Sequence, residues 1–407
     1  MKVLGSNPRG GSKEVTNNHK IYFENLDSLR FLAFFVVFVS HAALFLGFTS
    51  NSSLYQSIKY NILVNGDLGV TFFFVLSGFL ITFLLLKERE VSGGISLKKF
   101  YLRRILRIWP VYFVVLLMGY FLIPYLVQLF GSPSLPIDAL PPQSALPWHT
   151  FFITNFAMAR SFFSSVPTDI LWSVGIEEQF YLLWPLLVIL TPRRMLSRVV
   201  GLIVFAAFIF RGYFAHEPDV LAYSTFSAMS DLGIGCLLAI FVLSEYVSRL
   251  RAMFSKVTTW LLYILVFALT ISRHGLVSFF SDYEHVFSIF VPVLYLFVSI
   301  LFALIIFEQN ESNNSIFKAG KFPLMSGLGR ISYGLYAYHP AVYVFVLLIM
   351  TKIGSATSYS SPFKFLVVSI AVLISTIIFS KISYAVIEKW FLKRKPSSLT
   401  SSDSFSL

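Results

Sequence analysis

Ionisable side chains inside apolar runs are the residues of this sequence that could do chemistry. His41 lies in the stretch FVSHAALF, within the first long apolar run. Glu177 and Glu178 are adjacent in LWSVGIEEQFYLLWP, and His339 lies in ISYGLYAYHPAV. Groups of this kind are costly to bury among apolar residues, so each is a candidate for a functional role.

A histidine beside a carboxylate could act as a general base. The carboxylate would hold the imidazole in one tautomer and stabilise the imidazolium that forms when a proton is taken up. Neighbouring residues diverge by about 100° on a helix, so only one of Glu177 and Glu178 is expected to point at His41. The alternatives are a packed, helix-bonded His41, an interfacial structural role for the glutamates, and a structural hydrogen bond for His339.

Four arginines form a second candidate group. Arg30 lies three residues after Asp27, which allows an ion pair at the start of a helix. The segment YLRRILRIWPVY contains Arg103, Arg104 and Arg107, of which the first and last share a helix face. Guanidinium groups bind phosphates through paired N–H donors, so this cluster fits a polyanionic ligand. Anchoring of helix ends at the membrane surface is the alternative for all four.

The composition places these residues in a membrane protein. The 407 residues are 56% hydrophobic and 13% charged, with a mean hydropathy of +0.75, which is too apolar for a soluble domain. The net charge of +12 does not indicate a nucleic-acid partner, because the basic residues gather in short segments between apolar runs. The single cysteine, Cys236, lies in an apolar context that is typical of a packed residue.

Ten apolar runs are long enough to cross a bilayer, which takes about 20 residues. We therefore predict an all-α polytopic membrane protein with about ten transmembrane helices. Segment 148–158 is too short to span and is expected to be re-entrant or interfacial. The predicted spans are 28–48, 66–86, 108–129, 171–191, 199–215, 226–244, 257–272, 286–307, 331–350 and 364–387.

Lysine and arginine are unevenly distributed between the predicted loops. They are frequent after the second, fourth, sixth, eighth and tenth spans and scarce in the loops between. The positive-inside rule then places both termini in the cytoplasm. His41 would lie roughly 20 Å from the inner face and Glu177 roughly 10 Å from the outer one. In a hydrocarbon core of about 30 Å, both residues would therefore lie at the same depth.

The chain is expected to have three parts. Residues 1–27 would form a cytoplasmic N-terminal arm, and residues 28–392 the transmembrane domain. Residues 393–407 would form a basic, Ser-rich cytoplasmic tail.

Five stretches resemble, in order, the motifs of the acyltransferase 3 family of integral-membrane O-acyltransferases, from about residue 25 to 392. The resemblance implies a membrane enzyme that moves an acyl group, usually acetyl, from acyl-CoA to a hydroxyl of a carbohydrate or a glycosylated small molecule.

Ser28 departs from a common glycine of the opening motif. Because only residues 388–407 follow the last predicted span, we expect a stand-alone module without the C-terminal SGNH domain of some members. The stretches are NLDSLRFLAFFVVFVSHA, GDLGVTFFFVLSGFLIT, RRILRIWPVY, LWSVGIEEQFYLLWP and ISYGLYAYHPAV.

The resemblance also implies roles for individual residues. His41 matches the histidine thought to be catalytic, and Glu177 or Glu178 would orient its ring. The arginines expected to serve the acyl-CoA donor are Arg30, Arg103, Arg104 and Arg107. The residues expected to contact the acceptor or to support the structure are Trp172, Ser173, Tyr336 and His339.

We therefore expect an inner-membrane O-acyltransferase with His41 as general base and cytoplasmic acyl-CoA as co-substrate. The expected acceptor is a carbohydrate, such as O-antigen or another surface polysaccharide, exopolysaccharide or a lipid-linked sugar. No metal, permanently bound cofactor or nucleic acid is expected, and glycan-assembly enzymes are the expected protein partners. Direct transfer and a covalent acyl-His41 intermediate are both open. The alternative class is a transporter or flippase of a polar lipid or sugar, or an acyl-group exporter feeding a partner enzyme.

Overall fold

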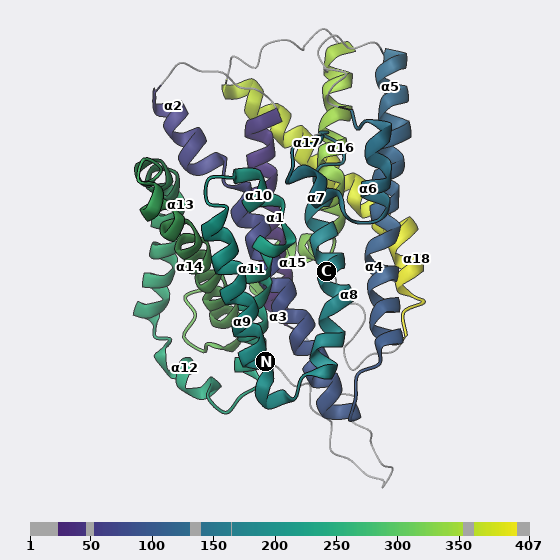
Figure 1. Ribbon diagram of the computed structural model, residues 1–407. Coiled ribbons are helices and arrows are strands. Elements are labelled where there is room, and N and C mark those ends of the chain that lie inside the picture. The colour runs from purple at the N-terminus through teal and green to yellow at the C-terminus, as the bar shows by residue number, and fades with distance from the viewer. Residues whose placement is uncertain (1–22, 46–52, 131–139, 164, 353–361, 397–407) are drawn as a thin grey trace.

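The computed structural model describes residues 23–45, 53–130, 140–163, 165–352 and 362–396. Within these residues the chain forms a bundle of long helices joined by short helices and turns (Figure 1). Ten helical segments in this part of the chain are long and apolar enough to cross a membrane, which confirms the predicted all-α polytopic class. The orientation of the termini stays a prediction.

The long helices follow the predicted spans closely. Shorter helices between them are α2 (Ser53–Ile58), η1 (Lys59–Leu63), η4 (Gln143–Ala145), α6 (Leu146–Thr150), α7 (Thr154–Met158), α10 (Pro218–Tyr223), α12 (Val247–Met253), η5 (Ala319–Lys321) and α15 (Pro323–Gly329). The spanning helices are α1 (Glu24–Phe45), α3 (Gly66–Ser92), α4 (Leu97–Leu117) continued by η2 (Met118–Leu122) and α5 (Ile123–Phe130), α8 (Leu171–Leu190), α9 (Arg193–Tyr213), α11 (Thr225–Val242), α13 (Lys256–Phe280), α14 (Glu284–Glu311), α16 (Ser332–Lys352), and α17 (Pro362–Ser383) continued by η6 (Tyr384–Glu388) and α18 (Lys389–Leu392).

Two helices differ most from the prediction. The third span was expected from residue 108, but α4 begins at Leu97, so its arginines lie on the helix itself. The seventh span was expected to end at residue 272, but α13 continues to Phe280. Polar residues in both extensions lowered the local hydropathy without breaking the helix, because Lys, Arg and Ser at helix ends reach the interface.

The segment expected to be too short to span forms α6 and α7, which are both short helices. Phe152 lies between them with a left-handed backbone, φ 58°. Its carbonyl accepts a hydrogen bond of 2.8 Å from the Gln179 amide of α8. This side-chain bond ties the short helices to the bundle.

Helix α3 occupies the centre of the bundle and packs most extensively against α11. A Cβ at Gly78 would lie 2.0 Å from the carbonyl oxygen of Leu232, and one at Gly235 would lie 1.9 Å from that of Val75. The two backbones therefore approach more closely than any side chain would allow, as small residues permit in membrane helices.

The helices that carry the candidate residues have different neighbours. Helix α1 packs against α3, α15 and α16, whereas α8 packs against α3, α4 and α7. A histidine on α1 is therefore placed beside α16, and carboxylates on α8 are placed beside α3 and α4.

Candidate active site

His41 of α1 and His339 of α16 form a hydrogen-bonded pair. Nδ1 of His41 lies 2.7 Å from Nε2 of His339. The ring centroids are 4.9 Å apart and the ring planes are inclined by 20°. His339 is fully buried, whereas His41 is half-buried. The structure thus joins two of the predicted site residues that are 298 positions apart in the sequence.

The proline after His339 explains how the second ring is held. Pro340 lies inside α16 and has no N–H, so the carbonyl of Tyr336, four residues earlier, lacks its usual helical donor. Nδ1 of His339 lies 2.7 Å from this carbonyl oxygen. The imidazole replaces the missing backbone donor, as a buried carbonyl in a membrane helix requires.

These two hydrogen bonds fix the tautomers of the neutral rings. A carbonyl only accepts, so Nδ1 of His339 carries its proton and Nε2 carries its lone pair. That lone pair accepts from Nδ1–H of His41. Nε2 of His41 then carries the lone pair that a general base needs.

Aromatic rings surround His339 and limit its movement. Phe34 and Phe38 of α1 present ring edges to it at centroid distances of 5.8 and 6.2 Å. The ring of Tyr343 stacks on Phe38 at 5.5 Å. A close-packed ring with both nitrogens bonded has few alternative rotamers, so His339 is preorganised to hold His41.

The two glutamates of α8 have other partners. Glu177 accepts hydrogen bonds from the hydroxyls of Ser77, at 2.7 Å, and Tyr181, at 3.0 Å. Glu178 accepts one of 3.2 Å from the indole N–H of Trp109. Nδ1 of His41 is bonded to His339, where the sequence had predicted a carboxylate of α8.

A cavity of about 40 Å³ lies between α3, α8 and α16, and we call it the central cavity. Its apolar wall includes Phe73 and Phe74, and its polar wall includes Ser173, Glu177 and Tyr336. The volume has room for about three water molecules. Because Tyr336 precedes His339 by three positions, the cavity lies within one helical turn of the histidine pair.

The polar residues at this cavity are connected to one another. The hydroxyls of Ser173 and Tyr336 lie 2.7 Å apart, and Ser173 donates to the carbonyl of Ile170 at 3.1 Å. Trp172, next to Ser173, packs edge-on against Phe74 with centroids 6.1 Å apart. Of the residues predicted to contact the acceptor or to support the structure, Ser173 and Tyr336 thus line the central cavity, and Trp172 packs against its wall.

Buried ion pairs hold two of the arginines. Arg30 pairs with Asp27 at 2.8 Å, and both side chains are 1% exposed, which confirms the predicted pair. Arg107 lies 3.7 Å from Glu388, and its guanidinium also donates to the carbonyl of Arg330 at 3.5 Å. The first pair belongs to one helix, whereas the second joins α4 to η6.

The other two arginines of α4 are more accessible. Arg103 pairs with Glu88 at 3.2 Å. The Arg104 guanidinium lies over the ring of Tyr181, 5.5 Å from its centroid. Tyr181 is a hydrogen-bond partner of Glu177. Among the described residues, Nε of Arg30 and Nε of Arg104 are buried with no hydrogen-bond partner. Unused buried donors of this kind are available to an anionic ligand.

Lys395, near the end of the described chain, lies close to these arginines. Burial, together with the positive charges of Arg107, Arg104 and Arg103, lowers the pKa of Lys395 to about 6. A polyanion bound here would favour the protonated ammonium. The arginine cluster is therefore a local excess of positive charge.

The sequence matches the model of a known family. A family model described as an acyltransferase domain matches residues 23–383, which is most of the chain. The chain belongs to this acyltransferase family. The match begins at the first described residue and includes both histidines, both glutamates and all four arginines.

Curated relatives of the chain carry related names. It is 30% identical over 346 residues to the peptidoglycan O-acetyltransferase OatA of Listeria monocytogenes, covering 80% of this chain and 50% of that protein. It is 27% identical over 390 residues to a putative peptidoglycan O-acetyltransferase, YrhL, of Bacillus subtilis, covering 92% of this chain and 55% of that protein. The chain thus spans about half the length of these relatives. No solved structure matches it.

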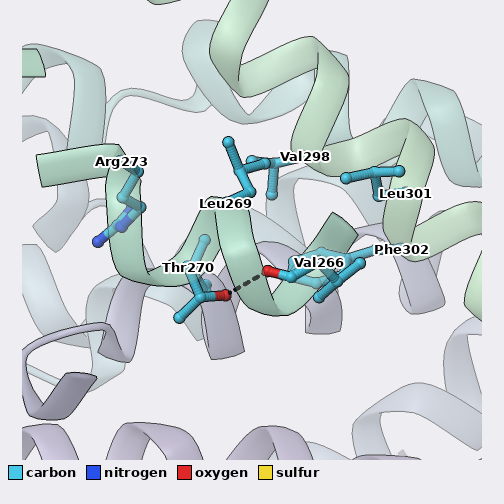
Figure 2. A pocket seen from close by; sticks show the side chains of 8 residues that line it. Val266, Leu269, Thr270, Arg273, Val298, Leu301 and Phe302 are labelled. Carbon is cyan, nitrogen blue, oxygen red and sulfur yellow. Dashed lines mark hydrogen bonds between the residues drawn. The ribbon is translucent and has the colours of Figure 1, made fainter. Parts of the chain in front are cut away.

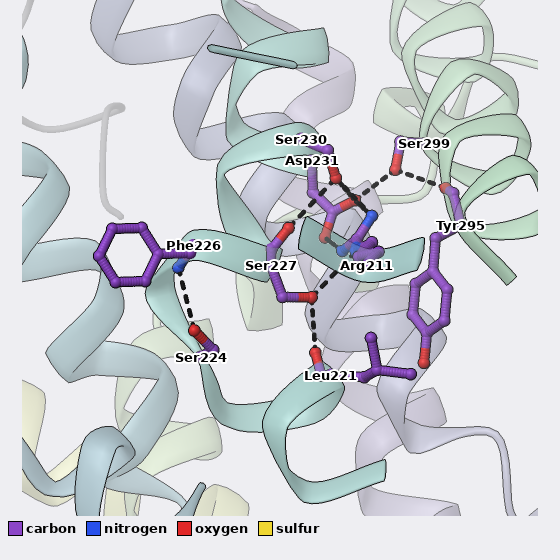
Figure 3. A network of polar contacts seen from close by, with 9 residues as sticks. All are labelled: Arg211, Leu221, Ser224, Phe226, Ser227, Ser230, Asp231, Tyr295 and Ser299. Carbon is purple, nitrogen blue, oxygen red and sulfur yellow. Dashed lines mark hydrogen bonds and ion pairs between the residues drawn. The ribbon is translucent and has the colours of Figure 1, made fainter. Parts of the chain in front are cut away.

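A second buried polar network joins α9, α11 and α14 of this family member (Figure 3). The guanidinium of Arg211 donates to both carboxylate oxygens of Asp231, at 3.2 and 2.8 Å, and through Nε to Ser227 at 2.9 Å. Ser299 donates to the same carboxylate at 2.5 Å, and the ring of Tyr295 lies 4.4 Å from the guanidinium carbon. Because protein groups satisfy the charges, the network is suited to holding the three helices together.

Replacing Asp231 by alanine is expected to destabilise the protein by about 3–5 kcal/mol, because Arg211 would be left buried without its counter-charge. The free energy of unfolding, measured by denaturant titration in mixed micelles, tests this. The double variant Asp231→Leu with Arg211→Met removes both charges and should recover most of the loss. An unchanged midpoint in Asp231→Ala would contradict a structural role.

Arg211 and Asp231 were not among the residues predicted from the sequence, although a signal was present. Both are charged residues inside predicted spans, Arg211 near the end of one span and Asp231 near the start of the next, so they lie toward the same side of the membrane. Opposite charges in that position commonly pair inside a membrane bundle. Likewise, the His–Pro dipeptide at residues 339 and 340 indicates a freed carbonyl that the histidine can satisfy.

Proposed function

We propose that the protein is a membrane O-acyltransferase that moves an acyl group, most simply acetyl, from acyl-CoA to a hydroxyl of a carbohydrate. The observation that carries this proposal is the His41–His339 pair, whose hydrogen bonds present the lone pair of His41 Nε2 as a base. Membership of an acyltransferase family and the names of the curated relatives support the reaction class.

In the proposed reaction, Nε2 of His41 takes the proton of the acceptor hydroxyl. The oxygen attacks the thioester carbonyl, a carbon–oxygen bond forms, and the carbon–sulfur bond breaks. The imidazolium then returns the proton to the CoA thiolate, so the products are the ester and free CoA. His339 accepts from Nδ1–H throughout and keeps the ring in place, which is a positioning role.

The central cavity is the proposed site of the acyl group. Its small volume of about 40 Å³ suits a short chain. Ser173, Tyr336 and Glu177 in its wall would adjoin the reacting carbonyl. Glu177, bonded to Ser77 and Tyr181, is a positioning residue of this wall in the proposal.

The arginine cluster is the proposed site of the CoA phosphates. The buried unused Nε atoms of Arg30 and Arg104 support an anionic ligand there. Arg104 lies over Tyr181, which bonds Glu177 of the central cavity wall. This chain of contacts connects the arginine cluster to the central cavity, as a long pantetheine arm would require.

The proposed acceptor is a cell-envelope polysaccharide. Two curated relatives are named as peptidoglycan O-acetyltransferases, one of them as putative. Mass spectrometry of envelope glycans from cells with and without the gene tests the proposal. Ester-linked acyl groups should be present only in cells that express the protein. Identical glycans in both, with the protein verified in the membrane, would contradict it.

Arg104→Gln is expected to raise the KM for acyl-CoA about tenfold or more, since a charged hydrogen bond contributes about 1.5–3 kcal/mol. The release of free CoA by purified protein in nanodiscs measures this. The defect should shrink at high salt, because screening weakens the wild-type interaction. Arg249→Gln is the matched control, because Arg249 is exposed and lies over Tyr246. Equal KM values for the two variants would argue against a donor site.

A further inference from the structure

The hydroxyls of Ser173 and Tyr336 form a pair in the wall of the central cavity, with their oxygens 2.7 Å apart. Ser173 donates its single hydrogen to the carbonyl of Ile170 at 3.1 Å, so Tyr336 is the donor within the pair. Ile170 is the N-cap residue of α8, and the carbonyl of an N-cap residue also accepts a bond within its helix. Ser173 can therefore turn its hydrogen toward Tyr336, which frees the Tyr336 hydrogen for a ligand in the cavity.

Helix α16 contributes three hydroxyls to the wall of the central cavity. Tyr333 donates to the carbonyl of Ile108 in α4 at 3.0 Å. Ser332 lies seven residues before His339, which is about 10 Å along a helix, whereas Tyr336 lies three residues before it, about 4.5 Å. The ring centroids of Tyr336 and His339 are 6.0 Å apart. Of these three hydroxyls, that of Tyr336 is thus the nearest to the histidine pair along the helix.

The order of groups along α16 places Tyr336 between the arginine cluster and the base. Arg107 of the cluster donates to the carbonyl of Arg330, just before α16 begins. Tyr336 follows six residues later, and His339, the partner of His41, follows three residues after that. An acyl-CoA that extends from the arginine cluster toward His41 would therefore bring its thioester past the Tyr336 hydroxyl.

A narrower cleft between α13 and α14 provides a contrast to the central cavity (Figure 2). Its volume of about 10 Å³ has room for about one water molecule. The hydroxyl of Thr270 in its wall donates to the carbonyl of Val266, one turn earlier in the same helix, at 2.8 Å. A hydroxyl that is bonded within its own helix is satisfied without a ligand. The Tyr336 hydroxyl instead bonds a hydroxyl of another helix, and both can rotate.

The surroundings of Tyr336 hold its ring in place. Phe73 of α3 packs edge-on against it, with the ring centroids 5.7 Å apart, and Tyr336 is only 6% exposed. Phe74 adds a second aromatic side chain to the cavity wall. A hydrogen bond to a developing charge is stronger in such an apolar, preorganised setting than in water.

We propose that the Tyr336 hydroxyl is the oxyanion donor of the acyl transfer, with Ser173 as its positioning residue; this inference rests on the proposed function. When the acceptor oxygen attacks, an electron pair of the thioester C=O bond moves onto the carbonyl oxygen. The Tyr336 O–H donates a hydrogen bond to that oxygen and keeps its proton. The pair returns when the carbon–sulfur bond breaks, and the C=O bond reforms. Ser173 donates to the Tyr336 oxygen and so strengthens the hydrogen bond that Tyr336 gives.

Tyr336→Phe should lower kcat about 30-fold, within the range that one hydrogen bond to a charged group provides. The rate of CoA release by the purified full chain in nanodiscs, at saturating acyl-CoA and acceptor, measures this loss. The KM for acyl-CoA should stay within about threefold of the wild-type value, because the charge develops on the carbonyl oxygen only during the reaction. Binding of the ketone analogue of acetyl-CoA, in which a methylene replaces the thioester sulfur, should be unchanged.

Tyr338→Phe is the matched control on the same helix. The Tyr338 hydroxyl lies 2.8 Å from that of Ser383 in α17, so this variant also removes a buried Tyr–Ser hydrogen bond. It should keep the wild-type kcat. Ser173→Ala should lower kcat about fivefold, as the loss of one neutral hydrogen bond would, with unchanged binding of the ketone analogue. This last variant tests the proposal if Tyr336→Phe does not fold.

The outcomes separate this inference from the proposed function. An active wild type together with an equally active Tyr336→Phe would overturn the inference and leave the proposed function intact. Equal losses of kcat in Tyr336→Phe and Tyr338→Phe would also overturn it, because they would show an effect of packing, and so would an unchanged kcat in Ser173→Ala. A wild type that releases no CoA would contradict the proposed function and this inference with it.

Discussion

His41→Ala should lower the rate of acyl transfer by about 10²–10⁴-fold, the range that a positioned general base contributes. The variant removes the only ring nitrogen that the pair with His339 presents as a base. The rate of CoA release in the presence of acceptor measures the loss. Folding should be preserved, since His41 is only half-buried and lies at the edge of the core.

A matched histidine variant separates the loss of the general base from the general effect of replacing a histidine by alanine. His285 lies exposed at the start of α14, and His285→Ala should retain the wild-type rate. Both variants should reach the membrane in equal amounts. Full activity in His41→Ala would eliminate His41 as the base.

His339→Leu should have the second largest effect, a loss of about 10²-fold in kcat with little change in KM. Leucine removes the acceptor for Nδ1–H of His41 and leaves the carbonyl of Tyr336 without its donor. The base would then lose both its fixed orientation and its fixed tautomer. Steady-state kinetics with varied acyl-CoA and varied acceptor separate kcat from KM.

A conservative variant distinguishes this positioning role from simple packing. His339→Gln supplies an amide oxygen that can accept from His41 and an amide N–H₂ that can donate to the Tyr336 carbonyl. It should therefore recover part of the activity. Its pH–rate profile should lie closer to that of the wild type than the profile of His339→Leu does. If leucine and glutamine lose the same activity with the same profile, His339 acts only through packing.

The sequence alone determined the class of the molecule and the chemistry of its interior. Hydropathy and length are local properties, so they predicted ten spans, and the described part of the chain has ten helical segments that fit them. The Asp27–Arg30 pair also followed from spacing, because residues three apart on a helix are neighbours. His41, the glutamates and the arginines were identified as candidates because ionisable groups are expensive in an apolar run.

Only the tertiary structure decided which of these residues meet. Depth along a helix predicted that His41 and the glutamates of α8 would lie at the same depth in the membrane. A shared depth does not determine which side chains contact each other. The packing of α1 on α16 places His339 beside His41. A helix pair is chosen by the fit of side chains along two whole surfaces, and that choice is not encoded in any short stretch of sequence.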